Sequence, residues 1–223
     1  MASLPSLAFD HLVITSHKLS AGMDYTRRMF GVDIPLGGQH HFMGTHNAVM
    51  AVGDGIYLEV IAIDPSLTVP SHPRWFGLGN VAFEDRLKDQ PLLTHYVLRT
   101  PDIDATLAGL PAGLREKLGP VHAASRGDLS WKITIHESGL PPEGGCLPAL
   151  IEWNGTPPQY GMARPGPEFD RLHLCHQNPE QLSQMLVDMG AADLMASGMI
   201  ATEKTSSLHL KADFTHRNKT IFI

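Results

Sequence analysis

The hydrophobic positions of the chain predict three segments that share one order, a short strand followed closely by a short amphipathic helix. The strands are apolar runs at about 9–14, 93–98 and 172–175, and apolar residues at helical spacing follow each of them. The first helix is expected from about Ser20 to a terminating Gly31. The repeated order indicates internal modules.

The starts of the second and third helices carry their own signals. Asp102 is a predicted N-cap, and so is Asn178, with Pro179 at the first helical position. Asp and Asn side chains accept hydrogen bonds from the backbone N–H groups of the first helical turn, and proline has no N–H group that would be left unpaired there. These signals place each helix directly after its strand.

The first two segments also share a register. His11 lies eight residues before Leu19, and His95 lies eight residues before Ile103. A strand histidine and a helix anchor at one common spacing predict a divergent internal duplication. In the third segment the corresponding spacing from His173 is nine residues, so that register is shifted by one.

Strand-like runs follow each helix, and an Asp54–Gly55 pair between two of them is a strong hairpin signal. The predicted fold is therefore α+β, with tandem βαβββ modules, curved mixed sheets and a partial third βαβ copy. The expected boundaries are a first module at 8–64, a connecting insertion at 65–91, a second module at 92–154, a linker at 155–168 and the partial third module at 169–223.

Composition and charge narrow the functional class. The 223 residues are 43% hydrophobic and 18% charged, below the usual ~25% charged, which favours a globular protein. The formal net charge of −6 provides no electrostatic footprint for nucleic acid. No apolar run reaches the ~18 residues of a membrane span, and Met1–Pro5 lacks the basic start of a signal peptide. These features predict a cytoplasmic protein without nucleic-acid or membrane partners.

Several chemistries lack their sequence motifs. The two cysteines, Cys146 and Cys175, form neither a disulfide framework nor a CxxC zinc motif. The chain also has no GxxxxGK[ST] loop, no GxGxxG after a strand, no GxSxG elbow and no HExxH. Nucleotide, flavin and serine-hydrolase chemistry are therefore not expected.

Each of the first two modules places a histidine on its opening strand and a glutamate on its closing strand. The pairs are His11 with Glu59 and His95 with Glu152. If the modules curve around one cleft, two imidazoles and two carboxylates would converge on a divalent ion such as Zn, Ni, Co, Mn or Fe(II). Alternatively, each is a buried polar residue with a hydrogen-bond partner.

Further polar and aromatic residues are candidates for binding a substrate. They are His40, His46, Asn47, Arg126 and Trp131. The histidines and the asparagine lie in a glycine-containing stretch, where the backbone can approach a ligand closely. Arg126 would bind a substrate carboxylate with two hydrogen bonds, or would instead form an ion pair with a strand glutamate. Trp75, Phe76 and Trp131 would form apolar walls of the pocket or belong to the core.

The chain resembles the glyoxalase-like domain family of the vicinal oxygen chelate superfamily, from about residue 8 to residue 155. The resemblance is carried by the stretches 9–13, 37–40, 44–48, 53–62, 125–131 and 150–153. It implies that His11, Glu59, His95 and Glu152 are metal ligands. It also implies a cleft between modules one and two, completed either within the chain or by a second chain in a homodimer.

The resemblance implies three functions. The first is a metal-dependent lyase or isomerase of a small oxygenated carbonyl or carboxylate substrate, in which Glu59 or Glu152 is the base and the ion stabilises an enediolate. The second is an Fe(II) extradiol-type dioxygenase that uses His11, His95 and Glu152, a set that Glu59 would crowd. The third is a non-catalytic small-molecule binding or resistance protein, so catalysis itself stays open.

Overall fold

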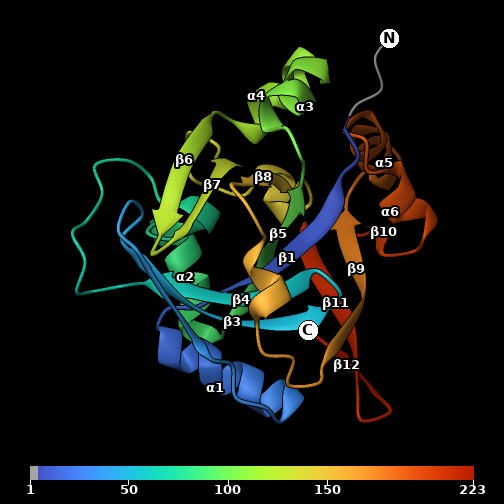
Figure 1. The fold of residues 1–223 in the computed structure, drawn as a ribbon. Coiled ribbons are helices and arrows are strands. Elements are labelled where there is room, and N and C mark those ends of the chain that lie inside the picture. The colour runs from blue at the N-terminus through green and yellow to red at the C-terminus, as the bar shows by residue number, and fades with distance from the viewer. Residues whose placement is uncertain (1–4) are drawn as a thin grey trace.

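Two βαβββ units lie side by side and form one curved eight-stranded sheet in this computed structural model, which describes residues 5–223 (Figure 1). The strand order is β2-β3-β4-β1-β5-β8-β7-β6. The first unit contains β1 (Ala8–Thr15), α1 (Leu19–Phe30), β2 (Leu36–His40), β3 (Thr45–Gly53) and β4 (Ile56–Ile63).

The second unit repeats this order, with two short helices in place of one. It contains β5 (Leu92–Arg99), α3 (Ile103–Gly109), α4 (Ala112–Leu118), β6 (Val121–Arg126), β7 (Leu129–Thr134), the short helix η2 (Pro142–Gly145) and β8 (Ala149–Trp153). In both units the first strand pairs in parallel with the last, and β1 pairs antiparallel with β5 at the junction. The edge strands β2 and β6 contact each other, so the sheet is nearly a barrel.

A smaller second sheet follows a linker that contains η3 (Pro158–Gly161). Its strand β9 pairs in parallel with β10 and antiparallel with β11, which gives a βαβ unit flanked by a hairpin and confirms the expected partial third copy. The elements are β9 (Glu168–His176), α5 (Pro179–Asp188), α6 (Ala192–Ala196), β10 (Ile200–Lys204), β11 (His209–His216) and β12 (Lys219–Phe222).

The helix signals of the sequence are confirmed. α1 ends at Gly31, whose φ of 70° is the left-handed conformation that glycine adopts without strain. The side chains of Asp102 and Asn178 accept hydrogen bonds from backbone N–H groups of α3 and α5. No helix within residues 5–223 is long and apolar enough to cross a membrane.

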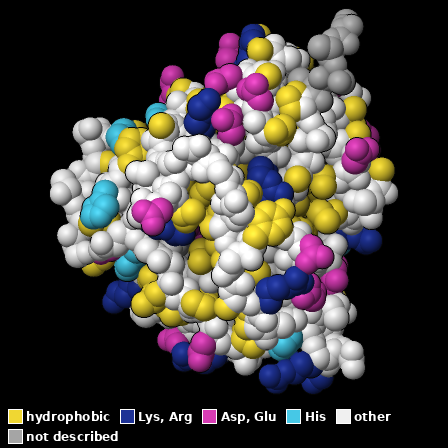
Figure 2. All heavy atoms as spheres, viewed as in Figure 1, with side chains coloured by type: hydrophobic (Ala, Val, Ile, Leu, Met, Phe, Trp, Pro, Cys, Tyr) yellow, Lys and Arg dark blue, Asp and Glu magenta, His cyan; other side chains and the backbone are white. Residues whose placement is uncertain are grey.

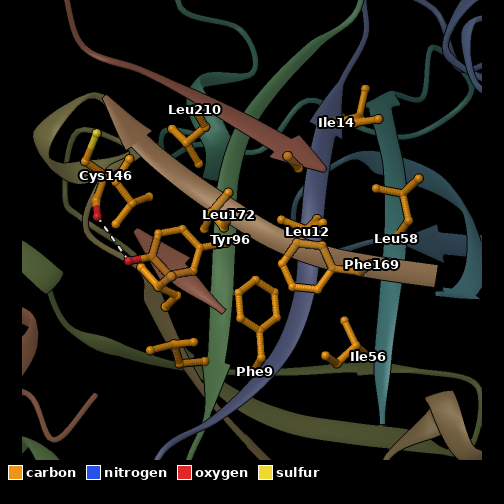
Figure 3. Close-up of a cluster of buried hydrophobic side chains, with 14 of the residues drawn as sticks. Phe9, Leu12, Ile14, Ile56, Leu58, Tyr96, Cys146, Phe169, Leu172 and Leu210 are labelled. Carbon is orange, nitrogen blue, oxygen red and sulfur yellow. Dashed lines mark hydrogen bonds between the residues drawn. The ribbon is translucent and has the colours of Figure 1, made fainter. Parts of the chain in front are cut away.

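The two faces of the large sheet belong to two hydrophobic clusters. Leu12 and Ile14 of β1 join Tyr96 and Phe169 in the main core, which the large sheet shares with the second sheet (Figure 3). Val13, between them in sequence, lies in a second cluster on the concave face. This alternation is the two-residue period of a strand, and it determines which residues can reach the cleft.

The connecting segment between the units occupies the concave face. It contains η1 (Trp75–Gly77) and α2 (Val81–Asp89), and Trp75, Phe76 and Leu87 belong to the same hydrophobic cluster as Val13. In the preceding loop, His72 packs on Phe42, whose ring also contacts His122 of β6. Histidine side chains (cyan) lie at this edge of the molecule in Figure 2, where acidic and basic side chains are interspersed over the viewed face. Because Trp75 and Phe76 are buried on the concave face, aromatic side chains of the insertion fill much of the cleft.

Candidate functional site

A small cavity lies on the concave face between the two units. Its polar lining comes from β1, β2, β3, β4 and β6, and its aromatic lining from the insertion and from β7 and β8. The cavity volume is about 30 Å³, which is room for roughly two water molecules. The lining residues are His11, His40, Asn47, Tyr57, Glu59, Trp75, Phe76, Arg126, Trp131, Ile133, Ile151 and Trp153.

His11 is held in place from both sides of its ring. Its Nδ1 lies 2.7 Å from Asp10 Oδ1, and the ring stacks on Tyr57 with centroids 4.4 Å apart. A carboxylate only accepts hydrogen bonds, so Nδ1 carries a proton and donates it to Asp10. Nε2 therefore faces the cavity, 3.7 Å from Glu59 Oε2.

Asp10 is fully buried, and it has four donors. Besides His11, its carboxylate accepts from Arg99 Nη1 at 2.9 Å, Trp153 Nε1 at 3.1 Å and Gln159 Nε2 at 3.0 Å. Burial raises the pKa of Asp10, but the hydrogen bonds and the charges of His11 and Arg99 outweigh it and hold the pKa below its usual value. Asp10 is thus an ionised anchor for His11, supported by strands of both units and by the linker.

Glu59 and Arg126 are connected through Asn47. The Asn47 amide donates to Glu59 Oε1 at 2.6 Å, and its carbonyl oxygen accepts from Arg126 Nη1 at 2.8 Å. Within residues 5–223, no carboxylate lies within 4.0 Å of the Arg126 guanidinium. Arg126 therefore presents a cation to the cavity without a neutralising acid, which suits an anionic ligand.

His40 is a neutral acceptor for the same arginine. Burial and the positive charge of Arg126 lower the pKa of His40 to about 3. Its Nε2 lies 3.4 Å from Arg126 Nη1, and its Nδ1 lies 3.1 Å from Thr45 Oγ1. The arginine can only donate, so the proton of His40 lies on Nδ1. Uncharged His40 thereby orients Arg126 without repelling it.

Two glycines make this arrangement possible. A Cβ at Gly37 would lie 2.2 Å from Asn47 Oδ1, and one at Gly38 would lie 2.8 Å from Arg126 Cδ. The Gly38 N–H also donates to Asn47 Oδ1 at 3.0 Å. The glycine-containing stretch singled out in the sequence therefore lets β2 pass directly over the asparagine and the arginine.

Glu152 does not reach the cavity, contrary to the sequence-based expectation. Its Oε2 accepts from the Ile103 N–H at the start of α3, at 2.7 Å, and its Oε1 lies 3.7 Å from Lys132 Nζ. The strand pairing explains the difference between the two glutamates. In the first unit Glu59 of β4 pairs with Val13 of β1, whereas in the second unit the residue of β8 that pairs with Val97 of β5 is Ala149. Glu152 is three residues beyond Ala149, and an odd step places a side chain on the other face.

His95 lies on the same face as His11 but outside its cavity. It pairs with Val13, and its side chain lines a second, neighbouring cavity. Phe76 packs against its ring, with centroids 5.5 Å apart. Trp75 and Phe76 line both cavities, so the insertion separates the two histidines.

The remaining predicted residues divide between the cavity and the surface. His40, Asn47, Arg126 and Trp131 line the cavity. His46 does not, since it points to the other face of β3, where its Nδ1 lies 3.3 Å from Asp64 Oδ2.

The residues present do not fit the predicted four-ligand metal site. His11 and Glu59 meet at the cavity, but Glu152 lies on the opposite face and His95 lies behind the insertion. Among residues 5–223, no group of three or more His, Cys, Asp or Glu side chains could hold a metal ion. Catalytic zinc sites usually have three protein ligands, and the dioxygenase set of His11, His95 and Glu152 is likewise divided.

Several residues of the site were not predicted from the sequence, among them Tyr57, Asp10 and Gln159. Tyr57 lies two residues before Glu59, so the strand period alone would have placed it on the same face. Asp10 precedes His11, and a bulge between Phe9 and His11 turns it toward the histidine. Gln159 comes from the linker, and no local pattern signals its contact with Asp10.

Comparison with protein families gives a match over most of the chain. The model of the family described as "Glyoxalase-like domain" matches residues 9–190, which include all twelve residues that line the cavity. The search for similar proteins of curated function found no match.

Comparison with solved structures gives a match with a TM-score above 0.5, which shows a similar fold, and further matches below that value. A hypothetical protein from Staphylococcus aureus has a TM-score of 0.57 at 16% identity, over 97% of this chain and 84% of that one. A methylmalonyl-CoA epimerase from Streptomyces coelicolor has a TM-score of 0.42 at 21% identity, over 70% and 99%. A 4-hydroxymandelate synthase variant from Streptomyces coelicolor has 0.48 at 10% identity, over 98% and 62%.

Proposed function

Since the chain belongs to the glyoxalase-like domain family of the vicinal oxygen chelate superfamily, we propose that it is an isomerase or lyase. The proposed reaction transfers a proton next to the carbonyl of a small anionic substrate. One observation carries this: His11 Nε2 faces a cavity while Asp10 holds Nδ1 at 2.7 Å, and the same cavity contains the Arg126 cation, which has no acid partner among residues 5–223.

In this proposal His11 is the general base. With Nδ1 protonated toward Asp10, neutral His11 has its lone pair on Nε2, directed at the cavity. When Nε2 takes the substrate proton, the carboxylates of Asp10 and Glu59 stabilise the imidazolium, at 2.7 and 3.7 Å. Glu59 is a weaker candidate for the base because Asn47 already binds one of its oxygens at 2.6 Å.

Arg126 binds the substrate anion. Its contacts are neutral ones, to Asn47 and His40, and a carboxylate would add a charge-assisted pair. The negative charge that develops on the carbonyl oxygen as the proton leaves would also be stabilised by this cation. The volume of about 30 Å³ means that Arg126 or an aromatic wall must shift for the substrate to enter.

The test is deuterium exchange into a generic substrate. With 2-oxobutyrate in D₂O, proton NMR follows loss of the signal of the hydrogens next to the carbonyl. We expect exchange above the buffer rate with the purified protein, and loss of it in His11→Ala. A rate equal to buffer across a panel of small oxo acids, with folded protein and demonstrated binding, would refute the proposal.

A metal-dependent version of the reaction is tested separately. His11 and Glu59 are one donor short of the usual three protein ligands, so we expect exchange to survive dialysis against a chelator. Metal content is measured on the same sample. A stoichiometric ion whose removal abolishes exchange, and whose return restores it, would establish the Lewis-acid version instead.

The aromatic lining favours a second candidate, a non-catalytic binding protein. Trp75, Phe76, Trp131 and Trp153 form much of the cavity wall, as in sites that hold apolar ligands. Titration with anionic aromatic compounds would then change the tryptophan fluorescence with no exchange activity at all. Binding together with exchange would favour the isomerase or lyase.

A further inference from the structure

The second cavity beside His95 has no role in the reaction proposed above. Its volume is about 20 Å³, and its walls are mainly apolar. They come from the insertion, from α4, from β7 and β8, and from the proline-containing segment around η2. In its present shape it has room for about one water molecule.

His95 is an unusual side chain for such a place. The residue is only 2% exposed, and its Nδ1 is a buried nitrogen that has no hydrogen-bond partner in the described part of the chain. Burial lowers the pKa of His95 to about 3, and the nearby Gly145 backbone acts in the opposite direction. The ring is therefore neutral, and Nδ1 is a buried nitrogen with no hydrogen-bond partner within residues 5–223, on a residue that lines an apolar pocket. An unpaired buried polar atom is costly, so it indicates a missing partner.

The wall between the two cavities is a strained segment. Phe76 has a φ of 56° and a ψ of 25°, a left-handed conformation that is rare for a bulky residue. Trp75 and Phe76 stack with centroids 5.5 Å apart and line both cavities. Gly77, with a φ of 77°, follows directly. Strain of this kind is typical of ligand clamps and switch segments.

We propose that the His95 cavity is a second ligand subsite, which receives a hydroxyl-bearing apolar group once the Phe76 ring moves from between the two cavities. A hydroxyl group both donates and accepts, so it suits Nδ1 whichever nitrogen of the neutral ring carries the proton. The apolar walls, including Leu118, Ile135 and Ala149, match the rest of such a group. The subsite rests on the proposed function only for the anionic end of the ligand, at Arg126.

The test measures binding at His95 and not turnover, so its failure is distinct from failure of the exchange assay. Benzyl alcohol is the probe, and ethylbenzene, with a methyl in place of the hydroxyl, is its matched control. In ¹⁵N spectra of histidine-labelled protein, benzyl alcohol should shift the His95 Nδ1 signal and ethylbenzene should not. Phe76→Ala should bind benzyl alcohol about tenfold more tightly, because it removes the dividing ring.

His95→Leu provides the matched variant. It keeps an apolar side chain of moderate size and removes the unpartnered nitrogen, so the fold should tolerate it. Combined with Phe76→Ala, it should lower the preference for benzyl alcohol over ethylbenzene by about tenfold, the scale of a buried hydrogen bond. An Nδ1 signal that benzyl alcohol leaves unchanged in both the unaltered protein and Phe76→Ala would overturn the proposal. An equal preference with and without His95 would overturn it as well.

Discussion

The two halves of the cleft differ in what surrounds their equivalent strand histidines, His11 and His95. His11 and His95 share a register relative to their helices and lie on one face of the sheet. His11 is surrounded by carboxylates at 2.7 and 3.7 Å, whereas His95 is among apolar walls with Nδ1 unpaired. Much of the difference arises two residues after each histidine, where Val13 pairs with Glu59 in the first unit and Val97 pairs with Ala149 in the second.

This comparison shows that a duplicated position does not imply a duplicated role. An imidazole between two acids has a partner for the charge it gains on taking a proton. An imidazole in an apolar pocket is held neutral and serves as a hydrogen-bonding atom. The first half is therefore suited to proton transfer, and the second to recognition.

The largest effect is expected from His11→Ala. Removal of a positioned general base typically lowers a rate by roughly 10²–10⁴-fold, so deuterium exchange into 2-oxobutyrate should fall by about that factor. His46→Ala is the control, because His46 lies on the other face of β3, beside Asp64. If both variants retained the original exchange rate, the assignment of chemistry to the first half would be wrong.

Local sequence signals were sufficient for the fold and for half of the site. The Gly31 terminus and the Asn178 cap depend on backbone chemistry within a few residues, and both were predicted. His11 and Glu59 come together because β1 and β4 pair in parallel. The position of Glu152 depends on which way β8 faces after the turn at η2, and one residue of register reverses it.

The insertion shows a second limit of prediction from the sequence. Its residues 65–91 read as a connecting loop, yet Trp75 and Phe76 lie deep in the cleft, 4% and 6% exposed. Nothing in the local pattern distinguishes a buried aromatic pair that fills a cleft from an ordinary core pair. The division of the cleft into two cavities therefore required the three-dimensional structure.

Asp10→Asn should have the next largest effect, on stability. It leaves Arg99 and His11 without their acid, and breaking a buried ion pair costs about 3–5 kcal/mol. Arg99 is partly exposed, so the loss should lie near about 3 kcal/mol in urea unfolding at neutral pH. An unchanged free energy of unfolding would show that the anchor of the first half is dispensable.

The pH dependence of the same pair sharpens the result. Because the pKa of Asp10 is lower in the folded than in the unfolded chain, its ionisation stabilises the fold fully above about pH 4. That contribution is lost as the pH falls through the folded value. The stability difference between the original protein and Asp10→Asn should therefore shrink below about pH 4, and a constant difference would contradict the assigned charge.

Arg126→Met tests the anion site. The substitution keeps an apolar stem and removes the guanidinium, so the cavity wall is largely preserved. Charged hydrogen bonds contribute about 1.5–3 kcal/mol, so the KM for 2-oxobutyrate should rise by roughly 10- to 100-fold. The KM of a neutral ketone such as butanone should change much less, while kcat falls for both compounds because the developing oxyanion loses the cation. An equal rise in KM for the acid and the ketone would mean that Arg126 does not bind the carboxylate.

The smallest effect is expected from Glu152→Gln, the counterpart in sequence of a change at Glu59. Glu152 binds the Ile103 N–H at the start of α3, where a negative charge contributes about 0.3–1 kcal/mol. The free energy of unfolding should fall by about this amount, while exchange stays within about twofold of the original rate, since the side chain lies on the far face of the sheet. Glu59→Gln should instead lower the exchange rate, because in the proposed reaction that carboxylate stabilises the His11 imidazolium. If Glu152→Gln lost exchange activity as strongly as Glu59→Gln, both halves would take part in the chemistry, and the proposed difference between them would be wrong.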